Sequence, residues 1–430
     1  MKRKRVLPLC FGMLFASAVA SAQEKSSTTL EDLVRASLDR NREVLALRQR
    51  VLQFQGLRKQ ASVRPALEIQ AEVGSGSPLG SAGEQEFSAG VTQPVETFGK
   101  RANRVRVAEF SVAIAEAELD AKRAQIAYDI ETTYLAMVYE RERIVVLDRV
   151  VESLRESGRL TEARVKEGDA APLEAQLIAV EVSRAEAQRT DAAGRLAIAE
   201  LEVRRVAGLP TQDKLPGIAS PTVGKVLLSL EQLIARALEK RADVRTARLL
   251  EQQGGAETAL ANAQSRPDVT LSARYSHSNS SLDGQYGFTS AGALTPLRDR
   301  FNALRVGVSV PLVTKRRNQG AIEAAAGSAA SARLRREYLE STVPLEVQTA
   351  YERWTSAMRT RDLLRDDVVG QSTKNLAVIR EAYQLGQLRL LDVLNEQRRL
   401  TDTELTFLDA RAQVARALAE LERTTGGLLP

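Results

Sequence analysis

The side chains that most often carry catalysis or bind transition metals are scarce in this sequence. Its 430 residues include one cysteine, Cys10, and one histidine, His277. Zinc and copper sites usually combine several such side chains. The sequence also lacks a glycine-rich phosphate loop, a Ser/His/Asp arrangement and an HExxH motif. We therefore expect no catalytic residue, no metal site and no cofactor, and we interpret His277 as an exposed histidine where a strand meets a loop.

The N-terminus has the pattern of a secretory signal peptide. A basic segment, "MKRKR", precedes an apolar run and a small-residue cleavage site that ends at Ala22. The apolar run is shorter than the ~20 residues of a membrane-spanning helix. Cys10 and four cations would leave with residues 1–22, and the formal net charge would fall from +6 to about +2. A near-neutral exported chain argues against nucleic acid as a partner.

The rest of the chain is an internal duplication. "TLEDLVRASLDRNREV" from Thr29 is matched by "SLEQLIARALEKRADV" from Ser229, and "GVTQPVETFGKRANR" from Gly90 by "GVSVPLVTKRRNQG" from Gly307. Further pairs of segments follow in the same order, which chance does not explain. The predicted divisions are a signal peptide at 1–22, a first repeat at 23–210, a linker at 211–228 and a second repeat at 229–430.

Two proline-poor tracts predict long helices. Proline breaks a helix interior, yet only Pro172 falls within residues 95–209 and only Pro344 within residues 312–429, where it should kink the helix. Apolar residues recur at spacings of three and four, as on one helical face, and frequent alanine lets helices pack closely. The predicted helices are 99–168 and 171–207 in the first repeat and 318–386 and 390–425 in the second, with turns at Gly168 and Gly386.

Ahead of each long helix the pattern changes to alternation. In "DVTLSARYS", apolar Leu271 and Ala273 alternate with polar Ser272 and Arg274, which is the period of a strand. The sequence therefore predicts β-hairpins at about 65–96 and 267–313, each with an apolar and a polar face. The polar side chains expected to face inward, toward a channel lumen or simply a solvated interior, are Glu68, Gln70, Glu72, Arg274 and Arg305.

These strands are typical of a transmembrane β-barrel, whose strands of about 9–11 residues are apolar outside and polar inside. Unpaired backbone groups cost several kcal/mol each in lipid, so the edges of such a sheet must close. Four strands cannot close around a lumen, because the smallest single-chain barrels have about eight. We therefore expect the chain to pool its strands with copies of itself.

The duplicated order of these segments resembles the TolC-like outer-membrane efflux family over essentially the whole mature chain. The segments that carry the resemblance are "LEDLVRASLDRN" and "LEQLIARALEKR", "QPVETFGKR" and "VPLVTKRRNQG", and "EGDAAPLEA" and "LGQLRLLDVLN". The resemblance implies a mainly α fold with membrane β: a homotrimer whose 12-stranded β-barrel, surrounded by outer-membrane lipid, continues into a long periplasmic α-helical barrel. It also implies two protein partners, a periplasmic adaptor and an inner-membrane pump of the RND type.

The function implied is that of an outer-membrane exit duct that passively conducts cargo delivered by the pump. "QPVETFGKR" and "GDAAPLEAQ" are most similar to the heavy-metal, CzcC-like branch of the family, which favours metal cations as cargo and leaves drugs as the next choice. A type I protein secretion duct is a further alternative. A periplasmic coiled-coil scaffold without a pore would explain the helices but not four strands placed symmetrically in both repeats.

The resemblance further implies a gate where the long helices turn. In the family, polar contacts between helices at this periplasmic tip hold the channel closed. Tyr383 and Asp392 match a gate tyrosine and a gate aspartate, and Glu174 matches an aspartate position. Asn395 stands where some members have an acid, and Arg389 lies beside a position that can be arginine. The alternative is that these are ordinary polar residues at helix starts, where acids are favoured by the helix dipole.

Overall fold

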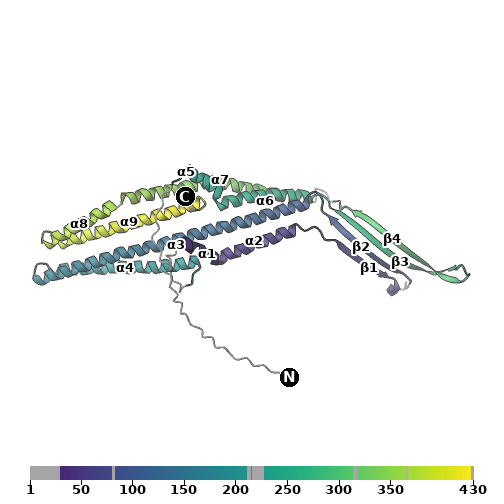
Figure 1. Ribbon diagram of the computed structural model, residues 1–430, viewed down its shortest axis with the longest axis horizontal. Coiled ribbons are helices and arrows are strands. Elements are labelled where there is room, and N and C mark those ends of the chain that lie inside the picture. Colours follow the sequence, from purple (N-terminus) through teal and green to yellow (C-terminus); the bar gives the residue numbers. More distant parts are fainter. Residues whose placement is uncertain are drawn as a thin grey trace, which may run out of the picture.

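The computed structural model describes residues 30–79, 83–210, 215, 227–312, 318–364 and 366–427. The expected signal peptide, 1–22, lies outside the described residues, and so does most of the expected linker, 211–228. The elements follow one order twice, in which helices lead into a β-hairpin and then into longer helices (Figure 1).

The first half of the chain contains the helices α1 (Leu30–Arg40) and α2 (Arg42–Ala61), the strands β1 (Glu68–Ser75) and β2 (Gln85–Val95), and the helices α3 (Lys100–Glu167) and α4 (Pro172–Ala207). The second half contains α5 (Leu230–Lys240), α6 (Ala242–Gln264), β3 (Val269–Phe288), β4 (Leu294–Ser309), α7 (Gln319–Leu363), α8 (Asp366–Gln384) and α9 (Leu390–Thr424). Polar side chains cap the N-termini of some of these helices. Asn41 accepts the amide hydrogens of Glu43 and Val44 at the start of α2, and Ser229 begins α5 with a capping box.

Helix α3 has 68 residues and runs between two glycines, which gives it a length of roughly 100 Å at ~1.5 Å per residue. Gly168 ends the helix with φ 85°, in the left-handed region that glycine adopts without a steric penalty. The amide of Asp169 bonds back to the carbonyl of Arg164 at 2.9 Å. Pro172, the first residue of α4, needs no amide partner there, so the turn is short and the two helices run antiparallel.

The second long helix is not continuous, which corrects the prediction of one helix over 318–386. Helix α7 ends at Leu363, Leu364 leaves the helical conformation with φ −99° and ψ 16°, and α8 begins at Asp366. The helix runs on through Pro344 instead of ending there. The absence of a proline near residue 364 permits a continuous helix but does not require one, because packing decides where a long helix breaks.

The strands form one antiparallel sheet in the order β1-β2-β3-β4. Paired residues share a face of the sheet, and one row of pairs runs from Ile69 through Val91 and Ala273 to Val306. This apolar face is open, since Ile69 and Val306 are each 78% exposed. Strands β1 and β4 are both edge strands whose outer backbone groups are unpaired within the described chain.

Strand β3 is longer than expected, and His277 therefore lies within it and not at a loop boundary. It pairs with Phe87 on one side and Asn302 on the other. The serines that follow His277 read as a loop in the sequence, but they continue the strand because their backbones pair with β4. Strand propensity depends strongly on such partners.

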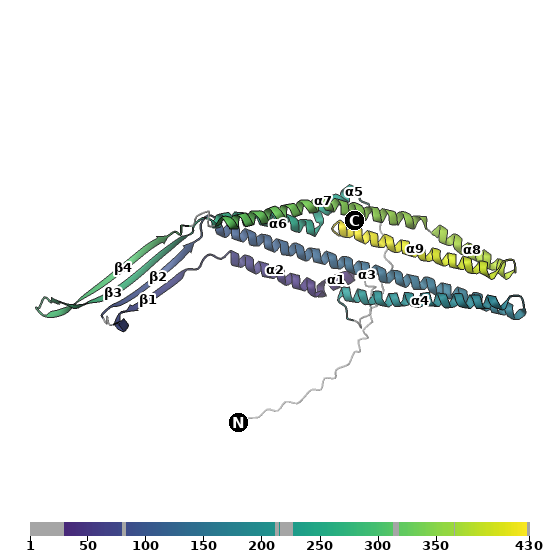
Figure 2. The same ribbon diagram turned by 180° about the vertical axis from the view of Figure 1, so that it is seen from behind.

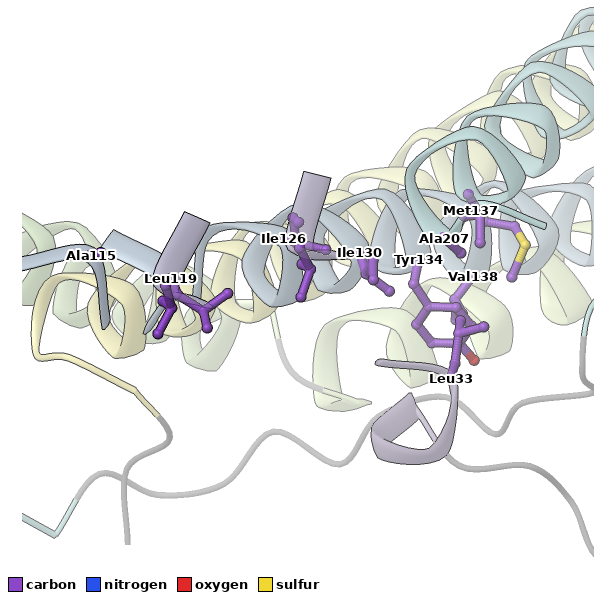
Figure 3. Packing of buried hydrophobic residues seen from close by; sticks show 12 residues of the cluster. Leu33, Ala115, Leu119, Ile126, Ile130, Tyr134, Met137, Val138 and Ala207 are labelled. Atoms are coloured by element: carbon purple, nitrogen blue, oxygen red, sulfur yellow. The ribbon is translucent and has the colours of Figure 1, made fainter. Parts of the chain in front are cut away.

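The helical core is a strip along α3 and not a compact centre. Figure 3 shows Leu119, Ile130, Tyr134 and Val138 along α3, with Leu33 of α1 packed below Tyr134 and Val138.

Helices α6 and α7 lie so close together that a Cβ at Gly254 would lie 2.8 Å from the Cα of Ala329. Among the helices described, none combines the length and the apolar character needed to cross a bilayer.

Candidate functional site

The two helix turns lie together at one end of the molecule, opposite the strands. Figure 2 shows the turn between α3 and α4 beside the turn between α8 and α9. Gly168 and Gly386 both have positive φ, at 85° and 74°, and both turns close with the same pair of backbone hydrogen bonds. A shared apolar cluster packs below them and includes Leu154 of α3, Ile178 of α4 and Leu390 of α9. The sequence repeat thus places two equivalent turns side by side.

Tyr383 and Glu174, each predicted from the sequence as a gate residue, are in contact at this end. The hydroxyl of Tyr383 on α8 donates a hydrogen bond of 3.0 Å to Oε2 of Glu174 in the first turn of α4. The tyrosine is 7% exposed and belongs to the apolar cluster. The contact therefore joins the helix hairpin of the first repeat to that of the second.

Two residues of α3 complete this cluster, and sequence reasoning missed both. The guanidinium of Arg164 lies 4.7 Å from the centre of the Tyr383 ring, a cation–π geometry, and its Nη1 donates to the Tyr383 carbonyl at 3.1 Å. The hydroxyl of Thr161 lies 3.4 Å from that of Tyr383. The available signal was their spacing, because Thr161, Arg164 and Gly168 fall on one face of the last turns of α3. We call Tyr383, Glu174, Arg164 and Thr161 the tip cluster.

Burial raises the pKa of the Tyr383 hydroxyl above its ordinary value, and the hydrogen bond to Glu174 raises it further, while Thr161 opposes the change. The neutral phenol is the form that can donate to a carboxylate. A raised pKa keeps this form over a wider pH range, so the contact persists up to alkaline pH.

The remaining residues expected at the gate do not join the tip cluster within one chain. Arg389, Asp392 and Asn395 are all exposed. Oδ2 of Asp392 accepts the backbone amide of Arg389 at 3.1 Å, so Asp392 caps the helix it begins. This is the role that an ordinary acid at a helix start would have. Their exposure leaves these side chains open to another copy of the chain.

A second polar contact binds α8 to the neighbouring helices, further from the turns. Nη2 of Arg380 donates to the hydroxyl of Ser153 on α3 and, at 2.8 Å, to Oε1 of Gln397 on α9. Burial lowers the pKa of Arg380, against the charge of Glu156. Two arginines therefore hold the last turns of α8: Arg380 binds side chains of α3 and α9, and Arg164 reaches from α3 to Tyr383.

On the polar face of the sheet, three of the five expected side chains meet. Arg274 donates from Nη1 to Glu72 at 2.7 Å and from Nη2 to Gln70 at 3.0 Å. Arg305 pairs with Arg274 across β3 and β4 and donates to Ser276 at 3.3 Å. Like charges on paired positions repel, and Glu72 offsets that repulsion. Glu68 lies on the same face beside Thr92, outside this contact.

These sites are suited to holding elements in place and to lining a passage. Among the described residues, no group of three or more His, Cys, Asp or Glu side chains is placed to hold a metal ion. At both ends of the molecule, polar side chains instead join strands or helices that belong to different repeats.

The family described as "Outer membrane efflux protein" matches residues 33–209 and 233–427, which covers both repeats. The chain belongs to this family.

Relatives and solved structures agree with that assignment. The chain is 22% identical to the cobalt-zinc-cadmium resistance protein CzcC of Cupriavidus metallidurans, over 77% of this chain and 75% of the relative. It is 24% identical to the solvent efflux pump outer membrane protein SrpC of Pseudomonas putida, over 95% of this chain and 88% of the relative.

Among solved structures, the fold is similar to that of the outer-membrane channel OprN, with a TM-score of 0.73, 19% identity and coverage of 93% and 90% of the two chains. It is also similar to the open state of the MtrE channel of Neisseria gonorrhoeae, with a TM-score of 0.71, 19% identity and coverage of 93% and 89%.

The expectation of a TolC-like fold, with membrane strands and a long helical extension, is therefore confirmed. The protein is an outer-membrane efflux channel of the transporter type, with its helices in the periplasm. The end of the hairpin β3–β4 points away from the helices (Figure 1).

Proposed function

We propose that the channel is a homotrimer that serves as the exit duct of a tripartite efflux pump. The observation that carries this proposal is the four-stranded sheet, which has two open edges and one exposed apolar face. An open edge in lipid leaves backbone groups unpaired at several kcal/mol each. Edge β4 of one copy pairing with edge β1 of the next removes every open edge, and three copies give a closed barrel of twelve strands.

The partners proposed are a periplasmic adaptor and an inner-membrane pump of the RND type, with the channel as the passive last step. The two relatives above are named for metal resistance and for solvent efflux, at similar identities of 22% and 24%. This supports a shared conduit whose cargo is selected upstream. Metal cations are the first choice of cargo, because the segments "QPVETFGKR" and "GDAAPLEAQ" are most similar to the heavy-metal branch, and small organic compounds are the second.

We further propose that the tip cluster holds the resting channel closed. Tyr383 and Glu174 join the two helix hairpins of one chain, so that neither can move outward alone. Asp392 and Asn395 are exposed beside them, and threefold symmetry would bring three copies of each around one axis. Arg389 would then meet an acid of the neighbouring copy.

The test is the mass and location of the native assembly. Outer-membrane fractions are solubilised in mild detergent, and the mass of the protein part is measured by light scattering. The expected result is a trimer that extracts only with detergent and changes its gel mobility on heating. A monomer or dimer in the soluble periplasmic fraction would support the scaffold alternative and overturn the channel trimer.

A further inference from the structure

The outward face of the hairpin β3–β4 changes from apolar to basic part-way along its strands. Nearest the helices, the rows on this face contain Leu271 with Val308 and Ala273 with Val306. Toward the exterior, the paired residues on the same face become His277 with Asn302, Asn279 with Arg300, and Ser281 with Arg298. Beyond the apolar rows, this face thus contains two arginines, and apolar side chains return nearer the turn, where Leu294 pairs with Phe288.

A polar cluster marks the change. The hydroxyl of Tyr275 donates to Oδ1 of Asn302 at 2.9 Å, and Nδ1 of His277 lies 2.7 Å from the same oxygen. An amide oxygen only accepts, so Nδ1 of His277 carries a hydrogen. Phe87 is the partner of His277 on β2. Aromatic side chains with a polar end are enriched where a barrel leaves the hydrocarbon layer, so this row lies at the headgroup boundary.

Arg298 and Arg300 lie just beyond that boundary, and both are exposed. Residues two apart on a strand share a face about 7 Å apart, whereas Asp299 between them faces the lumen side with Ser280. The paired rows of the two arginines contain no carboxylate. Within the described part of the chain, neither arginine has an ion pair.

The arginines on the two faces of the sheet differ in their partners. On the lumen face Arg274 has the carboxylate of Glu72 at 2.7 Å. On the outward face, none of the side chains that the structure describes pairs a carboxylate with Arg298 or Arg300, and anionic lipid headgroups can supply a counter-charge to such arginines.

We propose that Arg298 and Arg300 form a binding site for the phosphate groups of a phosphorylated lipid in the outer leaflet. The planar guanidinium donates two parallel hydrogen bonds to a phosphate, which a lysine does not. The acyl chains of the same lipid would lie along Leu304 and Val306, which are 74% and 78% exposed. A lipid fits both halves of this surface, whereas free phosphate fits only the arginines. The proposal rests on insertion of the strands in the outer membrane and not on the gate.

The test measures lipid binding to the full chain, purified as its native assembly in a zwitterionic detergent. The probe is a diphosphorylated lipid A, with its dephosphorylated form and inorganic phosphate as separate arms, and bound lipid is counted by native mass spectrometry. The variant is Arg298→Gln with Arg300→Gln. The control is Arg359→Gln with Lys374→Gln, which removes two exposed cations from the helices α7 and α8 instead of the strands.

We expect the wild type and the control to bind lipid A about thirtyfold more tightly than the double variant, as follows from two lost basic contacts at a lipid surface. The wild type should bind dephosphorylated lipid as weakly as the variant binds lipid A. Equal binding of the two lipids by the wild type would overturn the proposal even if the variant failed to assemble. Competition by inorganic phosphate at the same concentration as lipid A would also overturn it, because it would show a simple anion site.

Discussion

At the scale of single residues, the tip cluster shows how one hydrogen bond can hold two helix hairpins. Tyr383 is buried against α3, and its hydroxyl reaches Glu174 on α4. The ring itself is fixed independently by Arg164. Removing the hydroxyl should therefore loosen the link between the hairpins without displacing the ring, which separates the gate function from packing.

We predict that Tyr383→Phe opens the channel. One hydrogen bond to a charged acceptor is worth about 1.5–3 kcal/mol, so the open fraction should rise about tenfold or more. Uptake of a large polar antibiotic that the closed outer membrane excludes gives the readout. Tyr338→Phe is the matched control, since Tyr338 is 65% exposed on α7. Equal antibiotic uptake by the Tyr383 and Tyr338 variants would show that the tip cluster is not the gate.

A second residue-scale prediction concerns Glu131 on α3. Burial, followed by the nearby charge of Glu422, raises the pKa of Glu131 to about 7. A carboxyl whose pKa is higher in the folded protein than in the unfolded protein binds more protons in the folded state. Its contribution to stability therefore falls as pH rises from about 4.5 to about 7. Glu131→Gln should therefore raise the melting temperature by a few degrees at pH 8 and have little effect at pH 5.

The comparison for this variant is Glu109→Gln, on an exposed site of the same helix. Its difference from the wild type should not depend on pH. If the melting temperatures of the Glu131 variant and the wild type stay parallel from pH 5 to pH 8, Glu131 is not the titrating group.

At the scale of elements, the two faces of the sheet should respond oppositely to the same substitution. Leu271 and Val308 are paired on the outward face, whereas Ser272 faces the lumen beside Gly307. Arginine at Leu271 or Val308 should impair insertion by about 2–4 kcal/mol if the site lies near the bilayer midplane. Ser272→Arg should be tolerated better, as an arginine already occupies position 274 on that face. Equal yields of heat-modifiable protein for the outward-face variants and for Ser272→Arg would show that the two faces are wrongly assigned.

The same elements show what the sequence could and could not predict. Alternation of polar and apolar residues predicts which side of a strand is which, because side chains on a strand alternate. Glycines 168 and 386 predict the turns, since both residues adopt positive φ there. The break after Leu363 and the strand position of His277 were missed, because both depend on packing and pairing with distant residues. Arg164 and Thr161 were missed for the same reason, since they meet Tyr383 more than 200 residues away.

At the scale of the whole molecule, the duplication explains how one chain becomes a tube. Each repeat supplies one hairpin followed by long helices, two in the first repeat and three in the second. The open edges β1 and β4 are left for neighbouring copies. The tip residues that stay exposed in one chain, among them Arg389 and Asp392, are those that symmetry would gather around the axis. A narrow ring of carboxylates concentrates negative potential and attracts multivalent cations more strongly than monovalent ones.

Single-channel recording of the full chain in a planar bilayer shows directly whether the protein conducts. We expect discrete steps of low conductance, and block by a trivalent cation added on the periplasmic side. Asp392→Ala should relieve the block, Arg389→Ala should raise conductance, and Asp402→Ala, another exposed acid of α9, should change neither. Block that is unchanged in Asp392→Ala would move the constriction elsewhere, with Glu174 as the next candidate. A chain that inserts as a stable assembly yet passes no current is not a conduit.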